Sequence, residues 1–167
     1  MKSLLILGAG SFSTEVEELA RQLGYNDIAF LDDSPDTARC QPVIGKLDET
    51  SAFIQQFSSA IVALGNNEMR MKYTKMLLDA GYDVPVLIHP TAYVSKDAAL
   101  SCGCIVRAKA VISRYVKLGT AVIINAGVIV DHDCTIGEGV HCLPGAVVRN
   151  KVTVPPMRWI RANEVVE

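Results

Sequence analysis

The sequence has no excess of positive charge. Its 16 Lys and Arg residues are outnumbered by 18 Asp and Glu residues, so the formal net charge is −2. Proteins that bind nucleic acids need clustered cations to neutralise phosphates, and no basic stripe occurs in this chain. The composition therefore argues against nucleic acid as a partner.

Long hydrophobic runs are missing as well. The first apolar run, Leu4–Leu7, ends at a glycine and is shorter than the core of a signal peptide. No other run approaches the roughly 20 apolar residues that a membrane-spanning helix requires. We therefore expect a cytoplasmic protein without membrane insertion. Since 50% of the 167 residues are hydrophobic, the chain can bury a large core.

Cysteine and histidine are too few and too scattered for two common kinds of site. The five cysteines are odd in number and form no Cys-x-x-Cys pair, so neither a disulfide framework nor a zinc ribbon is indicated. The three histidines, His89, His132 and His141, lack the close pair found in β-helix zinc enzymes. We therefore expect no metal.

In the first half of the chain, strand-like and helix-like segments alternate. The ranges 3–10, 27–33 and 59–65 predict strands, and the ranges 11–24, 47–57 and 67–81 predict helices. The predicted buried stripe of the last helix is Met69, Tyr73, Met76 and Leu77. Such alternation is typical of a parallel sheet covered by helices. We expect an α/β, Rossmann-like domain over residues 1–87.

Beyond residue 87 the apolar period changes to six residues. Every sixth residue from Ile88 to Ile160 is Ile, Val or Leu, apart from Cys142. The position two residues earlier is mostly small, as at Ala110 and Cys134. A helix turns about 100° per residue, so this period gives no helical stripe, whereas residues two apart share one face of a strand. The pattern is typical of a hexapeptide parallel β-helix, predicted for residues 88–167.

Five stretches connect these two domains with a known family. They are "LLILGAGSFSTEVEELA", "FLDD", "VALGNNEMRMKY", "LIHPTAYVS" and "NAGVIVDHDCTIGEGVHCLPGA". The chain resembles bacterial sugar acetyltransferases of the sialic acid O-acetyltransferase and UDP-N-acetylbacillosamine N-acetyltransferase type. The resemblance implies a left-handed β-helix, a homotrimer, acetyl-CoA bound between subunits, and a nucleotide-linked amino sugar held by the N-terminal domain.

The resemblance also implies a set of site residues. His132 matches the general base, Asp133 supports it, and Asn125 lines the same site. The residues implied for acetyl-CoA are His141, which would lie beside the thioester, Gly145 and Ala146. The residues implied for the nucleotide sugar are Gly8, Gly10, Ser11, Asp32, Asp33, Gly65, Asn66 and Arg70.

Acetyl transfer from a thioester needs these types of residue. The attacking amine or hydroxyl must lose a proton, and histidine titrates near neutral pH. A carboxylate at Asp133 can fix the tautomer of His132, and Asn125 or backbone amides could donate to the developing oxyanion. Cys134 could carry an acyl group, but its small inward position favours packing. Alternatively, His132 and His141 are surface or coil-edge residues without a chemical role.

The glycine loop Gly8–Ser13 follows a predicted strand and precedes a helix, where amides and the helix dipole favour a phosphate. Asp32 follows about twenty residues later, as in dinucleotide-binding folds, where an acidic side chain at this distance hydrogen-bonds the ribose. Because Ser13 replaces the third glycine and the domain is small, a uridine nucleotide fits better than NAD. The glycines could instead serve a tight turn only, and Arg70 could be a solvated helix residue.

The chain departs from this family near its end. Residues 147–167 close the sequence after few coils, so we expect a shortened β-helix with less of the acetyl-CoA groove. Two other functions therefore stay open. One is O-acetylation of sialic acid or another glycan sugar, and the other is a non-catalytic homologue that binds a nucleotide sugar or serves in assembly.

Overall fold

The computed structural model describes residues 2–167. The chain divides into two units, one ending at Pro85 and the other running from Val86 to Glu167, a boundary two residues before the one we expected. Within the described residues, no helix is both long enough and apolar enough to cross a membrane.

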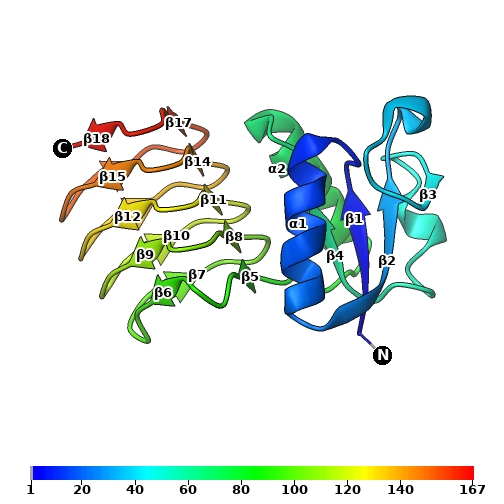
Figure 1. Ribbon diagram of the computed structural model, residues 1–167, viewed down its shortest axis with the longest axis horizontal. Coiled ribbons are helices and arrows are strands. Elements are labelled where there is room, and N and C mark those ends of the chain that lie inside the picture. The colour runs from blue at the N-terminus through cyan, green and yellow to red at the C-terminus, as the bar shows by residue number, and fades with distance from the viewer. Residues whose placement is uncertain (1) are drawn as a thin grey trace. The chain divides into compact units, whose positions relative to one another are not determined.

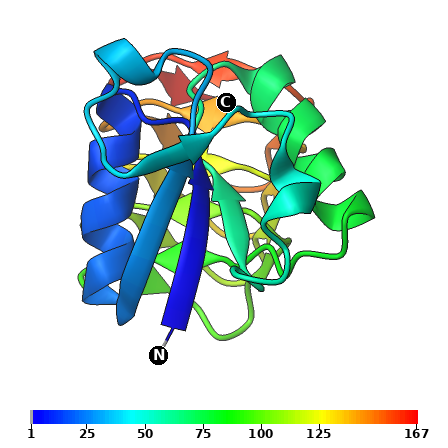
Figure 2. The same ribbon diagram turned by 90° about the vertical axis from the view of Figure 1, so that its right-hand side faces the viewer.

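The first unit is an α/β unit built on a parallel sheet. Its elements are β1 (Lys2–Leu7), α1 (Ser11–Gln22), β2 (Tyr25–Leu31), η1 (Pro35–Thr37), β3 (Val43–Gly45), η2 (Thr50–Ala52), β4 (Ala60–Val62) and α2 (Asn67–Asp79). The strand order is β3-β2-β1-β4, with all neighbours parallel (Figure 2). Since β2 and β4 flank β1 on opposite sides, the carboxyl ends of β1 and β4 form the switch point where α/β sheets bind ligands.

The predicted helix over 47–57 was wrong. This segment contains only η2, a single 3-10 turn, followed by further turns. Two contacts hold it in that form: the carbonyl of Thr50 accepts the Tyr82 hydroxyl at 2.6 Å, and the side chain of Phe57 is buried. Tertiary contacts therefore override the weak helical pattern of this stretch. The short strand β3 had no recognisable signal in the sequence.

The helix α2 is present, and its buried face includes Tyr73 and Leu77 of the predicted stripe but not Met69. Met69 is 41% exposed, whereas the neighbouring Arg70 is fully buried. The buried residues are Asn67, Arg70, Tyr73, Thr74 and Leu77. Arg70 lies on the buried face because its guanidinium donates to main-chain carbonyls before the helix, which hydropathy alone does not reveal.

The second unit is a parallel β-helix of two-residue strands. Sheet I contains β5 (Leu87–Ile88), β8 (Ile105–Val106), β11 (Ile123–Ile124), β14 (His141–Cys142) and β17 (Trp159–Ile160). Sheet II contains β6 (Tyr93–Val94), β9 (Val111–Ile112), β12 (Ile129–Val130), β15 (Val147–Val148) and β18 (Val165–Val166). Sheet III contains β7 (Ala99–Leu100), β10 (Lys117–Leu118), β13 (Thr135–Ile136) and β16 (Thr153–Val154).

Each strand pairs with the strand one full coil later, so Ile123 lies beside His141, eighteen residues on (Figure 1). The predicted inward residues confirm the hexapeptide pattern. The core holds both the aliphatic series, such as Val130 and Ile136, and the small series, such as Ala110 and Cys134. Many coil corners use a residue with positive φ; among non-glycine residues these include Asp133, at 61°. These corners expose polar side chains between buried strands, which is where the candidate catalytic residues lie.

Candidate active site

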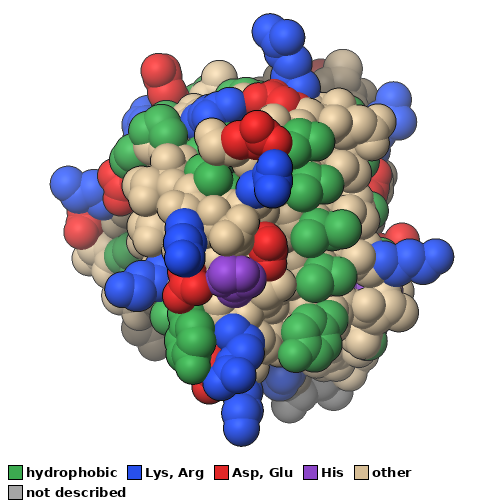
Figure 3. Space-filling model, turned by 90° about the vertical axis from the view of Figure 1, so that its left-hand side faces the viewer, with side chains coloured by type: hydrophobic (Ala, Val, Ile, Leu, Met, Phe, Trp, Pro, Cys, Tyr) green, Lys and Arg blue, Asp and Glu red, His purple; other side chains and the backbone are tan. Residues whose placement is uncertain are grey.

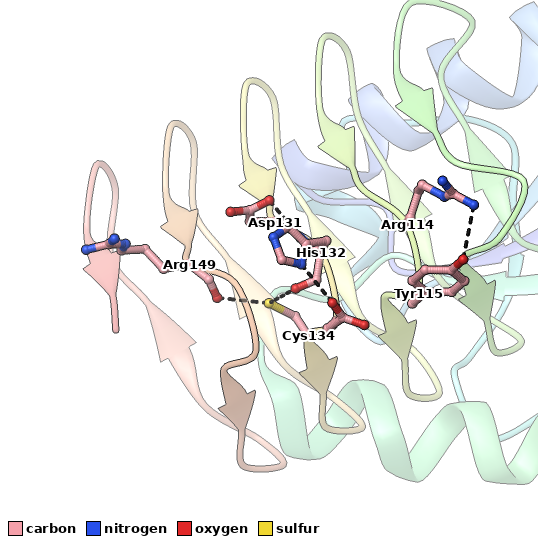
Figure 4. Close-up of polar contacts among 7 residues, drawn as sticks. Arg114, Tyr115, Asp131, His132, Cys134 and Arg149 are labelled. Atoms are coloured by element: carbon pink, nitrogen blue, oxygen red, sulfur yellow. Dashed lines mark hydrogen bonds and ion pairs between the residues drawn. The ribbon is translucent and has the colours of Figure 1, made fainter.

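The first cluster lies at the His132 corner, residues 131–134, between β12 and β13. The Nδ1 atom of His132 is 2.7 Å from Oδ2 of Asp133, and both side chains are nearly half exposed (Figure 4). A carboxylate only accepts hydrogen bonds, so Nδ1 carries a proton, and in the neutral form of the ring Nε2 keeps its lone pair. The corner therefore presents an imidazole in the tautomer that a general base requires.

The main chain of this corner is held from both sides. The backbone N–H of His132 donates to Oδ1 of Asp131 at 2.8 Å, and its carbonyl accepts the N–H of Lys151 from the next coil. The N–H of Asp133 donates to the carbonyl of Arg114 in the preceding coil. Hydrogen bonds to neighbouring coils thus fix the position from which the imidazole projects.

A groove of 320 Å³ adjoins the imidazole. It is lined by Ser113, Arg114, Tyr115, Asp131, His132 and Asp133. Arg114 Nε donates to Asp97 at 2.8 Å and its Nη2 donates to the Tyr115 hydroxyl at 3.0 Å. The hydrogen bond to Asp97 raises the pKa of Arg114, and the guanidinium also lies over the Tyr115 ring. The groove therefore offers a cation and an aromatic hydroxyl beside the His132 imidazole.

The sequence reasoning missed Arg114 and Tyr115. The available signal was the length of a coil, because residues eighteen positions apart stack on neighbouring rungs. That spacing puts Arg114 below His132 and Tyr115 below Asp133. Neither residue belongs to one of the motifs that carry the family resemblance.

The second cluster lies at the Asn125 corner, residues 125–128, between β11 and β12. Asn125 Nδ2 is 2.8 Å from His141 Nε2 and 3.1 Å from the Cys142 carbonyl oxygen. Its Oδ1 is 3.4 Å from Arg107 Nη1, and burial lowers the pKa of Arg107. Within one chain the structure therefore joins Asn125 with His141, while His132 and Asp133 occupy the following corner.

Two further residues were expected to bind the cofactor. The N–H of Gly145 donates to the Ala126 carbonyl at 3.1 Å, and the side chain of Ala146 belongs to the buried core. Only main-chain atoms of this pair are available to a ligand. Their contact with acetyl-CoA stays a prediction.

The cysteines of the β-helix are poorly suited to nucleophilic chemistry. Cys134 is fully buried, its thiol donates to the Arg149 carbonyl at 3.0 Å, and burial raises its pKa. Burial raises the pKa of Cys142 to about 12. Because the thiolate is the reactive form, both thiols are inert at neutral pH.

In the α/β unit, the glycine loop is held by an acid from the neighbouring strand. Asp32 Oδ2 accepts the N–H of Ala9 at 2.7 Å, and its Oδ1 accepts the N–H of Ser34. Gly8 has φ +102°, and an added Cβ would lie 2.8 Å from a Leu64 side-chain atom. Asp32 and Gly8 thus shape the loop itself, and their contact with a nucleotide stays a prediction.

The other predicted substrate residues lie at the same carboxyl edge of the sheet. Gly10 and Ser11 are exposed at the start of α1, and Asp33 accepts the N–H of Leu47 at 3.1 Å. Ser13, in place of a third glycine, donates from its hydroxyl to the Ala63 carbonyl after β4. These contacts shape this edge of the sheet, and the binding of a nucleotide sugar there stays a prediction.

The loop after β4 is organised by its own side chains. Asn66 caps α2, since its Oδ1 accepts the N–H of Met69 at 2.9 Å. Arg70 donates to the carbonyls of Leu64 and Gly65 at 3.0 and 3.1 Å. The fully buried Arg70 therefore has a structural role, and the substrate contacts of Gly65, Asn66 and Arg70 stay predictions.

A hexapeptide β-helix with a histidine beside a carboxylate at an exposed corner is an arrangement that suits an acyltransferase. Comparisons with known proteins also indicate an acyltransferase. Residues 3–77 match the family model of the PglD N-terminal domain. The whole chain matches a histidine-to-asparagine mutant of perosamine N-acetyltransferase from Caulobacter crescentus, solved with CoA and GDP-perosamine. That match has 26% identity, 89% coverage of the other chain and a TM-score of 0.85.

The acetyltransferase domain of PglB from Neisseria gonorrhoeae is 34% identical, with all of this chain and 92% of that domain covered and a TM-score of 0.74. The same domain solved with acetyl coenzyme A matches at 30% identity, over 99% of this chain and 92% of that one, with a TM-score of 0.63. The chain therefore belongs to the family of left-handed β-helix, acetyl-CoA-dependent sugar N-acetyltransferases. The resemblance and the fold class inferred from the sequence are confirmed.

Proposed function

We propose that this protein transfers the acetyl group of acetyl-CoA to the amino group of a nucleotide-linked amino sugar, with His132 as the general base. The observation that carries the proposal is the 2.7 Å contact between His132 Nδ1 and Asp133, which leaves the lone pair of Nε2 for a proton. The relatives support the reaction type, since one was solved with acetyl coenzyme A and another with CoA and GDP-perosamine.

The proposed reaction needs only the amine, acetyl-CoA, His132 and Asp133. The amine attacks the thioester carbonyl carbon, and a new C–N bond forms as the carbonyl oxygen becomes an oxyanion. His132 Nε2 accepts the proton that the nitrogen loses, and Asp133 stabilises the imidazolium. Collapse of the intermediate breaks the C–S bond, and the imidazolium returns its proton to the leaving CoA thiolate.

The proposal includes self-association through sheet II. Its outer positions form one uncharged column, with Tyr93 61%, Ile129 42% and Val165 55% exposed. Sheet III carries Ala99, Lys117, Thr135 and Thr153 at the equivalent positions. Figure 3 shows hydrophobic side chains gathered in a column on this part of the surface.

We infer that a second copy of the chain covers the sheet II column. The column runs over five strands, and its middle strand, β12, leads directly into the His132 corner, so a copy placed there would also border the groove. Apolar surface that is continuous with a candidate site usually marks an interface. The family resemblance makes a homotrimer the expected assembly.

Release of coenzyme A tests the function. Purified protein is given acetyl-CoA with UDP- or GDP-linked 4-amino-4,6-dideoxy sugars, and in parallel with the corresponding hydroxyl sugars and with free sialic acid. We expect release only with an amino sugar, and a fall in kcat of about 10²–10⁴-fold in His132→Gln.

The remaining outcomes decide between the alternatives. Release with a hydroxyl acceptor only would replace the amine with a hydroxyl as nucleophile. No release with any acceptor, from a folded protein that binds a nucleotide sugar, would support the non-catalytic homologue. Comparison of the UDP and GDP sugars identifies the nucleotide, since the sequence favours a uridine nucleotide over NAD and one relative was solved with a GDP sugar.

A further inference from the structure

Arg114 lines two grooves on the coil corners of the β-helix. The first is the groove beside His132, and the second is a groove of 500 Å³ lined by residues 93–97 and by Arg114. We propose that Arg114 binds the phosphate on C1 of the acceptor sugar and so determines which acceptors the protein binds. This inference deepens the proposed acetyl transfer and rests on it for the identity of the acceptor.

Arg114 occupies the same place in its coil as His132 occupies in the next one. The strands on both sides of these two corners pair in register, eighteen residues apart. The corners also turn alike, since Tyr115 and Asp133 both have a φ of 61°. Neighbouring strands lie about 4.8 Å apart, so the main chain at Arg114 runs directly beside that at His132 (Figure 4).

The guanidinium of Arg114 is held in place and still has donors to offer. Its Nε donates to Asp97 Oδ2 at 2.8 Å, and its Nη2 donates to the Tyr115 hydroxyl at 3.0 Å. A guanidinium has five N–H groups, so the others have no partner within the described residues 2–167. The side chain is 63% exposed, which opens these donors to a ligand. Such a planar fork suits two oxygens of one phosphate.

The charges around the two grooves are divided. Beside the imidazole, the acids Asp131 and Asp133 outnumber the single cation, Arg114. The second groove has two cations, Lys96 and Arg114, and one acid, Asp97. An acidic ligand group is therefore favoured in the second groove, whereas an amine, which donates to carboxylates, is favoured in the first. The pair of grooves is complementary to a molecule with an amine at one end and an acid at the other.

The distance between the grooves favours the acceptor over the acetyl donor as the source of the phosphate. A point one or two coils from His132 is roughly 5–10 Å away. In a 4-amino sugar that is linked through C1, only the pyranose ring separates the amine from the phosphate, which matches this span. In acetyl-CoA, the whole pantetheine arm separates the thioester from the nearest phosphate. The phosphate in the second groove therefore belongs to the sugar nucleotide.

Calorimetric titration tests this site without turnover. The probes are UDP- and GDP-linked 4-amino-4,6-dideoxy sugars, UDP and GDP themselves, and acetyl-CoA, each added alone. We expect Arg114→Gln to raise the Kd of the nucleotide sugar about 10–100-fold, which corresponds to the loss of hydrogen bonds between two charged groups. The matching nucleoside diphosphate should lose affinity too, whereas the Kd of acetyl-CoA should stay close to the wild-type value.

Two further variants serve as controls. Arg114→Lys keeps the charge but not the fork, so its loss of affinity should be smaller than that of Arg114→Gln. Arg21, an exposed arginine bonded to Glu17 in α1, provides the matched change: Arg21→Gln should bind every probe as the wild type does. A thermal melt checks that each variant is folded.

Three results would overturn the proposal. The first is an unchanged Kd of the nucleotide sugar in Arg114→Gln. The second is an equal loss for acetyl-CoA, which would assign Arg114 to the phosphates of the donor. The third is a wild-type protein that binds none of the nucleotides.

Kinetics separate this inference from the proposed function. At saturating acetyl-CoA, Arg114→Gln should raise the KM for the amino sugar about 10–100-fold and change kcat much less, because the contact is made before and during the reaction. A lowered kcat with a wild-type KM would contradict a binding role. A wild-type protein that binds the nucleotide sugar through Arg114 but never releases CoA would count against the proposed function alone.

Discussion

The Nδ1 atom of His132 lies 2.7 Å from Oδ2 of Asp133, although the two residues are consecutive in the chain. Side chains of consecutive residues in a strand point to opposite faces and cannot meet in this way. The positive φ of Asp133, 61°, turns the chain at this coil corner and brings the two groups together. The backbone geometry of the corner thus creates the contact between the imidazole and the carboxylate.

Asp133→Asn should reduce kcat about 10²-fold with little loss of stability. Asn tolerates positive φ, so the corner is preserved, but its amide can donate to Nδ1 and move the ring proton to Nε2. Steady-state kinetics and a thermal melt measure both effects. The exposed Asp79→Asn serves as the control for the loss of a carboxylate. Full activity in Asp133→Asn would remove this carboxylate from the mechanism.

Cys134→Ala should retain most of the wild-type turnover. The thiol is buried in the core and its pKa is raised by burial, so an acyl-enzyme on this residue is not expected. The loss of a small buried group should lower the free energy of unfolding by about 1 kcal/mol. Mass spectrometry after mixing with acetyl-CoA provides the decisive check, since an acetylated Cys134 would restore the covalent route.

Ile129→Glu should prevent the chain from associating with itself. The substitution places a charge in the middle of the sheet II column, where a partner would have to desolvate it. Thr135→Glu makes a similar change on the outer face of sheet III and should leave the assembly intact. Sedimentation velocity compares the two variants. Equal sedimentation of both would show that sheet II is not the interface.

Glu164 should make the last coil sensitive to acid. The backbone N–H of Arg161, followed by the Arg158 guanidinium, holds the pKa of Glu164 below its ordinary value of 4.5. A lowered pKa means that the ionised carboxylate stabilises the folded form. This stabilisation is present above pH 4.5 and is lost as the pH falls through the lowered value.

Amide hydrogen exchange measures this effect at Val147 and Arg149, whose N–H groups donate to the carbonyls of Glu164 and Val166. After correction for intrinsic exchange rates, protection of both amides should fall as the pH drops below 4.5. Glu164→Gln should abolish this change, and the exposed Glu138→Gln should preserve it. Equal pH dependence in wild type and Glu164→Gln would refute the role of Glu164.

The β-helix could be predicted because its physical requirement is local and repeated. Each six-residue unit must supply one large and one small inward side chain, and positions such as Val130 and Cys134 meet that requirement. The segment 47–57 could not be predicted in the same way. Its conformation depends on the distant Tyr82, whose hydroxyl binds the Thr50 carbonyl.

The sequence by itself determined the two-domain class and the inward residues of the β-helix, and it placed an acid next to His132. Only the tertiary structure decided that Asn125 binds His141 and that Arg114 and Tyr115 line the groove. The reason is physical. The hydropathy of a residue indicates whether its side chain faces the core. The hydrogen-bond partner of a polar side chain depends instead on the corner that the residue occupies and on the residues of the next coil beside it.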